Sequence, residues 1–304
     1  MDPETIIVTS DEAGERIDKL LANRYENHHS RTYFEYLIDE HLVLLNGEAV
    51  KKRIKPKEGD EIEVDFVLTP QIDIQPQPIP LNILFEDDDL IVVNKPEGMV
   101  VHPAPGNWNG TFVNGLLYHC EELSADPTNL RPGIVHRLDK DTTGVLLAVK
   151  HLAAQQNVID QFAKRKVTKH YLALCVGNPG KGKISAPIAR HLVHRKKMAV
   201  VESGKQAVSH YETLAYNGQM SLVKITPLTG RTHQIRVHMK HLGFPILGDP
   251  IYGNPSFNRK LGLHRQLLHA SELTIVHPTT KDSLTFKAPM PDDMSRYEII
   301  GSAG

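Results

Sequence analysis

Apolar residues at helical spacing open the chain and then give way to alternating polar and apolar residues. The pattern predicts two helices and then two strands, over 16–24, 31–39, 43–47 and 62–66. Ser30 is a suitable N-cap for the second helix, and an Asn46-Gly47 turn ends the first strand. We therefore expect residues 1–68 to form a small domain of two helices and a hairpin.

A proline-rich stretch separates this domain from the rest of the chain. Residues 69–80 contain four prolines and three glutamines without a helical period, which predicts an extended linker. Beyond it, the predicted strands cover 83–85, 90–93, 143–149, 167–176, 208–214, 222–225 and 267–276. The predicted helices cover 151–165 and 232–242. Because strands outnumber helices, we expect residues 81–304 to form one domain of the α+β class.

Composition narrows the class of protein. Of the 304 residues, 40% are hydrophobic and 23% are charged, as in an ordinary globular protein. The apolar runs are too short to span a bilayer, and the acidic N-terminus does not resemble a secretory signal. Cys120 and Cys175 match neither a disulfide framework nor a zinc cluster. We therefore expect reduced cysteines, a cytoplasmic location and no membrane partner.

The charges are distributed unevenly, although the net charge is only −1. Residues 1–66 carry 9 Lys and Arg against 16 Asp and Glu, whereas residues 150–304 carry 22 against 9. Such asymmetry predicts a basic surface in the C-terminal half and an anionic partner such as RNA.

Two polar stretches are candidates for chemistry. Residues 136–144 are polar in seven of nine positions and directly precede an apolar strand, where loops often carry function. A solvated turn would have the same composition. Residues 229–238 lead into a helix on which His233, Arg236 and Lys240 share a cationic face, suited to a carboxylate or phosphate. On periodicity alone, an amphipathic helix with a solvated face is the simpler interpretation.

The sequence contains no motif for a metal or a nucleotide cofactor. Although there are 17 histidines, neither H-E-x-x-H nor C-x-x-C occurs. Neither a glycine-rich dinucleotide motif nor a P-loop follows a strand. We therefore expect no metal and no cofactor.

Taken together, the segments resemble the RluA-type family of pseudouridine synthases. Residues 136–144 read HRLDKDTTG and match the family motif HRLDxxT[ST]G, and residues 230–238 match GRTHQIRxH. Further blocks match in family order at 94–96 with 101–103, 169–173, 248–253 and 265–270. Residues 15–66 resemble the S4-type RNA-binding domain that precedes the catalytic domain in many members. Residues 187–200 and 204–211 are most similar to the RluD-like subgroup.

The resemblance implies a fold, a reaction and roles for three residues. The fold would be an S4-type domain followed by a mixed-sheet catalytic domain. The reaction would isomerise a flipped-out uridine of RNA to pseudouridine without a cofactor. Asp139 matches the catalytic Asp, and Arg236 matches the Arg that holds that carboxylate ionised in a dry pocket. Tyr171 matches the pocket Tyr, whose ring can stack on the base.

Basic residues near these motifs are candidates for RNA contacts. They are Arg137, Arg231 and His233, together with the basic cluster Arg195, Lys196 and Lys197. The RluD-like resemblance implies that the partner is large-subunit (23S) ribosomal RNA or a pre-ribosomal particle, and we expect a monomer.

Three other functions fit part of the pattern. A tRNA pseudouridine synthase would carry the same catalytic motifs. A non-catalytic RNA-binding or ribosome-assembly factor would need no buried carboxylate, which the set of Asp139, Tyr171 and Arg236 disfavours. A glycosidase needs two carboxylates across the bond, whereas Asp139 and Asp141 are only two residues apart and one motif Asp is available.

Overall fold

The protein consists of two compact units. The structure, a computed structural model, describes residues 3–25, 31–66, 74–103, 109–120, 123, 131–191 and 197–297. Described residues up to Ile74 form the first unit, and those from Gln75 onward form the second. Within these ranges no helix has the length and apolar character that crossing a membrane requires.

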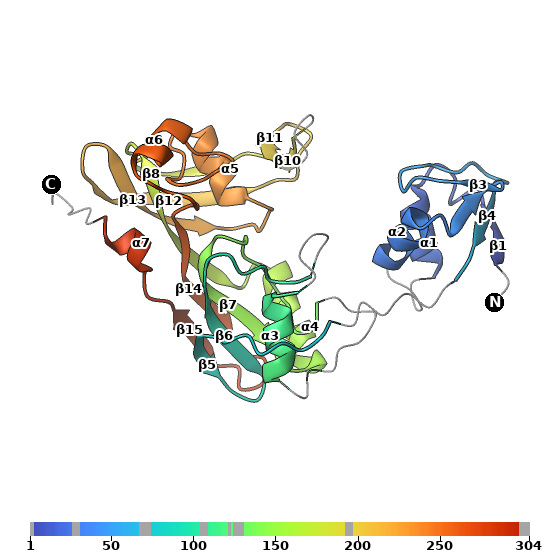
Figure 1. The fold of residues 1–304 in the computed structure, drawn as a ribbon, viewed down its shortest axis with the longest axis horizontal. Helices are drawn as coiled ribbons and strands as arrows, with labels where there is room; N and C mark the ends of the chain where they lie inside the picture. The colour runs from blue at the N-terminus through green and yellow to red at the C-terminus, as the bar shows by residue number, and fades with distance from the viewer. Residues whose placement is uncertain are drawn as a thin grey trace. The chain divides into compact units, whose positions relative to one another are not determined.

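The first unit packs two helices against a small antiparallel sheet. Its elements are β1 (Glu4–Ile7), α1 (Ile17–Arg24), α2 (Arg31–Asp39), β2 (Val43–Leu45), β3 (Glu48–Ala49) and β4 (Glu61–Val64) (Figure 1). The sheet order is β1-β4-β2-β3. Asn46 and Gly47 have φ of 52° and 81°, so the predicted turn is confirmed. The strand β1 was not predicted, and Ser30 lies outside the described residues.

The core of the first unit joins both helices to the sheet. Ile17 and Leu21 from α1 and Phe34 from α2 are fully buried against Ile62 and Val64 of β4. This is the apolar stripe that the helical spacing predicted. The described residues of this core all lie between Ile6 and Phe66, so both helices and the sheet of this unit contribute to it.

The second unit is built on a large mixed sheet. From one edge to the other, its paired strands follow the order β5 (Ile83–Glu86), β6 (Leu90–Lys95), β7 (Thr143–Val149), β14 (Leu268–Val276), β8 (Thr168–Val176), β13 (Met220–Pro227), β12 (Val208–Tyr216) and β9 (Lys181–Ser185). The strand β15 (Ser283–Lys287) pairs with β14. β7 and β14 run parallel, and the other pairs of this sheet are antiparallel among the described residues. The mixed sheet expected from the resemblance is confirmed.

Helices cover the two halves of this sheet. α4 (Leu152–Ala163) packs Ala154 and Val158 on the half that contains β7, and α5 (Gln234–His241) packs Ile235 and Met239 on the half that contains β13. The remaining elements are α3 (Phe112–His119), the hairpin β10 (Ile188–Arg190) and β11 (Met198–Val200), α6 (Pro255–Lys260) and α7 (Asp292–Ser295) (Figure 1).

Two features of the second unit differ from the predicted pattern. α5 begins at Gln234 rather than at residue 232, because His233 adopts a left-handed φ of 55° as the N-cap. Residues 75–80 were predicted as linker, yet they contact α3. Gln77 donates its N–H to the Asn114 carbonyl at 2.9 Å, and a Cβ on Gly115 would lie 3.1 Å from Ile79. Gly115 thus lets this segment approach α3 closely.

Candidate active site

Asp139 lies on a loop whose backbone is fixed by buried cations. The loop precedes β7, and the Asp139 side chain is 21% exposed. Lys95 is fully buried and donates to the Lys140 carbonyl at 2.7 Å, as well as to the carbonyls of Pro96 and Met99. Burial lowers the pKa of Lys95 to about 7, although nearby Asp141 and Asp139 oppose the shift. The carbonyl next to Asp139 is therefore held by the buried amino group of Lys95.

Arg236, from the first turn of α5, joins two carboxylates. Its Nε and Nη2 donate to Asp249 at 2.7 and 3.0 Å, and its Nη1 donates to Asp139 at 2.9 Å. Asp249 is completely buried and also accepts the backbone N–H groups of Ile251 and Tyr252. Burial alone would lower the pKa of the Arg236 guanidinium, but Asp249 and then Asp139 raise it above its ordinary value. Arg236 is thus an anchored cation that faces Asp139.

Arg236 corrects the simpler interpretation of this helix. Its side chain is only 4% exposed, whereas Lys240 is exposed, so the two do not share a solvated face. The turn before α5 is held by Gln234, which accepts the Thr229 hydroxyl at 2.7 Å and the Arg231 N–H at 3.0 Å. That turn positions the first residues of α5 toward the Asp139 loop.

His233 connects Asp139 to a tyrosine that the sequence analysis did not single out. The Tyr252 oxygen accepts the Met198 N–H at 2.7 Å, so its own O–H can donate to Nδ1 of His233, 2.8 Å away. Burial lowers the pKa of His233, which keeps the imidazole neutral. Its Nε2 then carries the proton and lies 4.0 Å from the Asp139 carboxylate.

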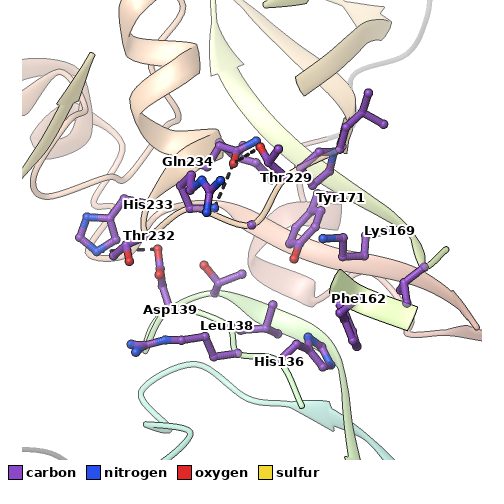
Figure 2. A pocket seen from close by; sticks show the side chains of 18 of the residues that line it. His136, Leu138, Asp139, Phe162, Lys169, Tyr171, Thr229, Thr232, His233 and Gln234 are labelled. Atoms are coloured by element: carbon purple, nitrogen blue, oxygen red, sulfur yellow. Dashed lines mark hydrogen bonds and ion pairs between the residues drawn. The ribbon is translucent and has the colours of Figure 1, made fainter. Parts of the chain in front are cut away.

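A cavity of about 560 Å³ opens beside Asp139. Its walls come from the loop before β7, the end of α4, the start of β8 and the turn before α5 (Figure 2). Tyr171 projects into it from β8, and its hydroxyl has no hydrogen-bond partner among the described residues. Burial and the charge of Asp139 raise the pKa of Tyr171, so the phenol stays protonated. A volume of this size accommodates a nucleotide.

Most of the predicted site residues lie together at this cavity. Asp139, Tyr171, Arg236, Arg137, Arg231 and His233 all line it. Lys197 does not line it but immediately precedes β11. Arg195 and Lys196 lie outside the described residues. The sequence analysis assigned no role to Lys95, Asp249, Tyr252 or Lys169, although each lies in a block that matched the family.

One group of described side chains has ligand atoms close enough for a metal ion. Glu86, His119 and Cys120 place these atoms within 4.8 Å of one another, away from the cavity. However, the Glu86 carboxylate already binds the Lys150 ammonium at 2.8 Å and Nε2 of His119 at 2.9 Å. We therefore interpret the group as an ion-pair network.

Comparison with known proteins identifies the family. A model of the family described as RNA pseudouridylate synthase matches residues 89–241, about half of the chain. The chain belongs to this family and is an isomerase that forms pseudouridine in RNA.

The relatives match over nearly the full length. An uncharacterized RNA pseudouridine synthase of Bacillus subtilis is 43% identical over 95% of each chain. Ribosomal large subunit pseudouridine synthase D of Zymomonas mobilis is 42% identical over 97% of this chain and 96% of the relative. Two solved human structures, RNA pseudouridylate synthase domain containing 4 and 1, share the fold with TM-scores of 0.56 and 0.57. Their sequences are 28% and 29% identical to this chain. The matched region covers 70% of this chain in both comparisons, and it covers 90% and 84% of the respective human chains.

Proposed function

We propose that the enzyme converts specific uridines of large-subunit ribosomal RNA to pseudouridine, with Asp139 as the catalytic residue. The observation that carries the role of Asp139 is its geometry. It is a partly exposed carboxylate at a nucleotide-sized cavity, bound to an arginine that a buried second carboxylate anchors. The choice of RNA rests on relatives named as ribosomal large subunit pseudouridine synthases, which are 40–43% identical to this chain.

The reaction begins when the target uridine leaves its stack. Flipping costs a few kcal/mol, which contacts between basic residues and phosphates can offset. Asp139 then acts on the nucleotide, either as a nucleophile or by withdrawing a proton from the ribose. Both routes need an ionised carboxylate, which Arg236 stabilises at 2.9 Å. Tyr171 stacks on the base and keeps it near the sugar while it rotates.

The bonds exchanged define the assay. The N1–C1′ bond breaks, a C5–C1′ bond forms, C5 loses its proton and N1 gains one. RNA transcribed with C5-tritiated uridine therefore releases tritium only when the new bond forms. We expect release from a large-subunit ribosomal RNA transcript and none from a tRNA pool made in the same way. Release from the tRNA pool alone would contradict the proposed substrate.

RNA-contacting roles are proposed for the residues around the cavity. Arg137 and Arg231 are exposed on its wall, and His233 lies beside Asp139. We propose that the Arg195, Lys196 and Lys197 cluster holds RNA backbone. Replacing all three by Gln should make the salt dependence of RNA binding shallower by about two to three units of log–log slope. An unchanged slope would remove the cluster from the RNA surface.

We propose that the first unit, within residues 1–68, is an S4-type RNA-binding domain that precedes a catalytic domain over 81–304. Of the linker expected over 69–80, residues 75–80 already pack on α3 as part of the second unit. The support for RNA binding is the local charge of the first unit. Lys51, Arg53, Lys55 and Lys57 are all exposed on one loop. Arg31, by contrast, is bound to Asp18. A patch on this loop would allow an otherwise acidic unit to bind phosphate.

A cytoplasmic monomer is the proposed working state. Ribosomal RNA is the substrate that we propose, and the two cysteines are buried and unpaired.

A further inference from the structure

Lys169 occupies the part of the cavity beyond Tyr171. The two residues are two apart on β8, so their side chains leave the same face of the strand. Figure 2 shows both pointing into the cavity, with Phe162 of α4 below Lys169. The Lys169 ammonium lies 5.8 Å from the centre of the Phe162 ring, a cation–π contact.

This ammonium has no anionic partner in the described part of the chain. Neither an ion pair nor a hydrogen bond of Lys169 is found there, and burial alone lowers its pKa. Lys95 shows how the same fold treats a buried lysine that is structural, because its ammonium donates to three carbonyls. A largely buried charge without a partner is costly unless a ligand supplies one.

The charges on the cavity wall indicate the sign of the charge that such a ligand would carry. Arg137, Arg165, Lys169, Arg231 and Arg236 line it, and Asp139 is the one acidic residue among the described lining residues. Asp139 is already paired with Arg236, which leaves the cations at the α4–β8 end uncompensated. An anion therefore suits this end of the cavity.

The surroundings of Lys169 are apolar, which strengthens such a contact. His136 stacks on Phe162 with ring centres 5.0 Å apart. Burial lowers the pKa of His136 to about 3, and its Nε2 accepts the Leu147 N–H at 2.9 Å, so it is neutral. A charge–charge contact beside these rings is screened less than one at the open surface.

We infer that Lys169, with Arg165, forms a phosphate subsite that binds a phosphodiester group next to the flipped uridine. The inference rests on the proposed function, because the RNA strand supplies the phosphate. The base would lie between Asp139 and Tyr171, and the neighbouring backbone would pass over the end of α4. Lys169 is thereby a substrate-binding residue that orients the nucleotide from the side opposite Asp139.

The test combines a substitution of Lys169 with the removal of the charge from one RNA phosphate, and it compares their separate and joint effects on binding. The probe is a synthetic stem-loop of large-subunit ribosomal RNA, made in versions that each carry one uncharged methylphosphonate next to the target uridine. Binding is measured for the wild type and for Lys169→Met, which keeps the stem on Phe162 but removes the charge. We expect one methylphosphonate to weaken wild-type binding about tenfold. Lys169→Met should bind the unmodified RNA about tenfold more weakly. At that linkage it should lose clearly less than the wild type, because only the contact with Arg165 remains.

Two control variants make the result specific. Lys287→Met removes an exposed lysine that does not line the cavity, and it should retain the wild-type loss at the linkage. Lys169→Arg keeps the charge and should restore most of the binding and the salt dependence. If Lys169→Met and every methylphosphonate weaken binding independently, the subsite is wrong. The cycle measures binding, whereas tritium release measures chemistry, so the subsite and the proposed function can fail separately.

Discussion

At the residue scale, the two carboxylates bound by Arg236 differ in burial, and the difference separates their tasks. Asp249 is fully buried and accepts two backbone N–H groups, so it anchors the guanidinium. Asp139 is 21% exposed and has the third guanidinium nitrogen as its partner. The arginine therefore holds the substrate-facing carboxylate without covering it.

Tyr252 supports this arrangement from two sides. Its ring lies 5.1 Å from the Arg236 guanidinium, and its hydroxyl joins Met198 of β11 to His233. We expect Tyr252→Phe to keep the ring contact but to leave His233 unheld and the Met198 N–H unpaired. The free energy of unfolding should fall by about 1–2 kcal/mol, and kcat should fall more than RNA affinity.

Tyr216→Phe is the matched control for this prediction. It removes a hydroxyl that donates to the Gly218 carbonyl on an exposed turn, and it should change neither kcat nor stability by much. Thermal unfolding and single-turnover tritium release measure the two effects. Equal kcat values for Tyr252→Phe and the wild type would contradict the role of the hydroxyl.

The sequence predicted some of these contacts and not others. Asp139, Arg236 and Tyr171 were singled out because their motifs match a family. Asp249 and Tyr252 are brought to the site by the turn between α5 and α6, which no local spacing encodes. Lys95 contacts a carbonyl 45 positions away, and only the β6–β7 pairing places it there.

At the element scale, β7 positions the Asp139 loop. Every residue of β7 is buried, because the strand has β6 on one side and β14 on the other. The sequence of a strand buried on both faces is a continuous apolar run, and the bounds of β7 were therefore predicted correctly. α5 was harder, because the left-handed conformation of His233 depends on contacts of Thr229 and Gln234 rather than on helical spacing.

Substitution of Gly144, near the start of β7, tests how closely the Asp139 loop depends on the pairing of β7 with β14. The φ of Gly144 is +110°, and an added Cβ would lie 2.2 Å from the Ala270 carbonyl oxygen of β14. We expect Gly144→Ala to lower the free energy of unfolding by about 3 kcal/mol or more, and to lower activity. The reason is that the parallel strands β7 and β14 must move apart to admit the added methyl group.

Gly180→Ala provides the comparison. Gly180 also has a positive φ, of +71°, but no atom lies within 4 Å of the added Cβ. Only backbone strain remains, which costs about 1 kcal/mol. Chemical denaturation of the two variants measures the difference. Equal destabilisation would show that the contact with β14 is relaxed at little cost.

At the scale of the whole molecule, histidines whose pKa is lowered by burial contribute to the response to acid, and His136 and His102 have large shifts. Burial lowers the pKa of His136 to about 3 and, together with Arg131 and Arg137, the pKa of His102 to about 4. Below an unfolded-state pKa of about 6.5, the unfolded chain binds protons that the native chain does not. Stability must therefore fall as the pH drops from about 6.5 toward 4.

We expect each histidine to remove about 2 kcal/mol of stability between pH 7 and pH 5. His136→Gln should remove about 2 kcal/mol of this dependence, because the variant's side chain cannot be protonated, although it can still accept the Leu147 N–H. His210→Gln, at an exposed position, should leave it unchanged. Urea denaturation at a series of pH values measures the slopes. An unaltered slope in His136→Gln would show that His136 is protonated in the native state.

The central claim is that Asp139 performs the chemistry of pseudouridine formation, and one substitution tests it most directly. Tritium release from C5-labelled large-subunit ribosomal RNA should fall by about 10³-fold or more in Asp139→Asn. RNA binding and thermal unfolding, measured on the same preparations, should stay close to those of the wild type. Release by Asp139→Asn at the wild-type rate would contradict the account.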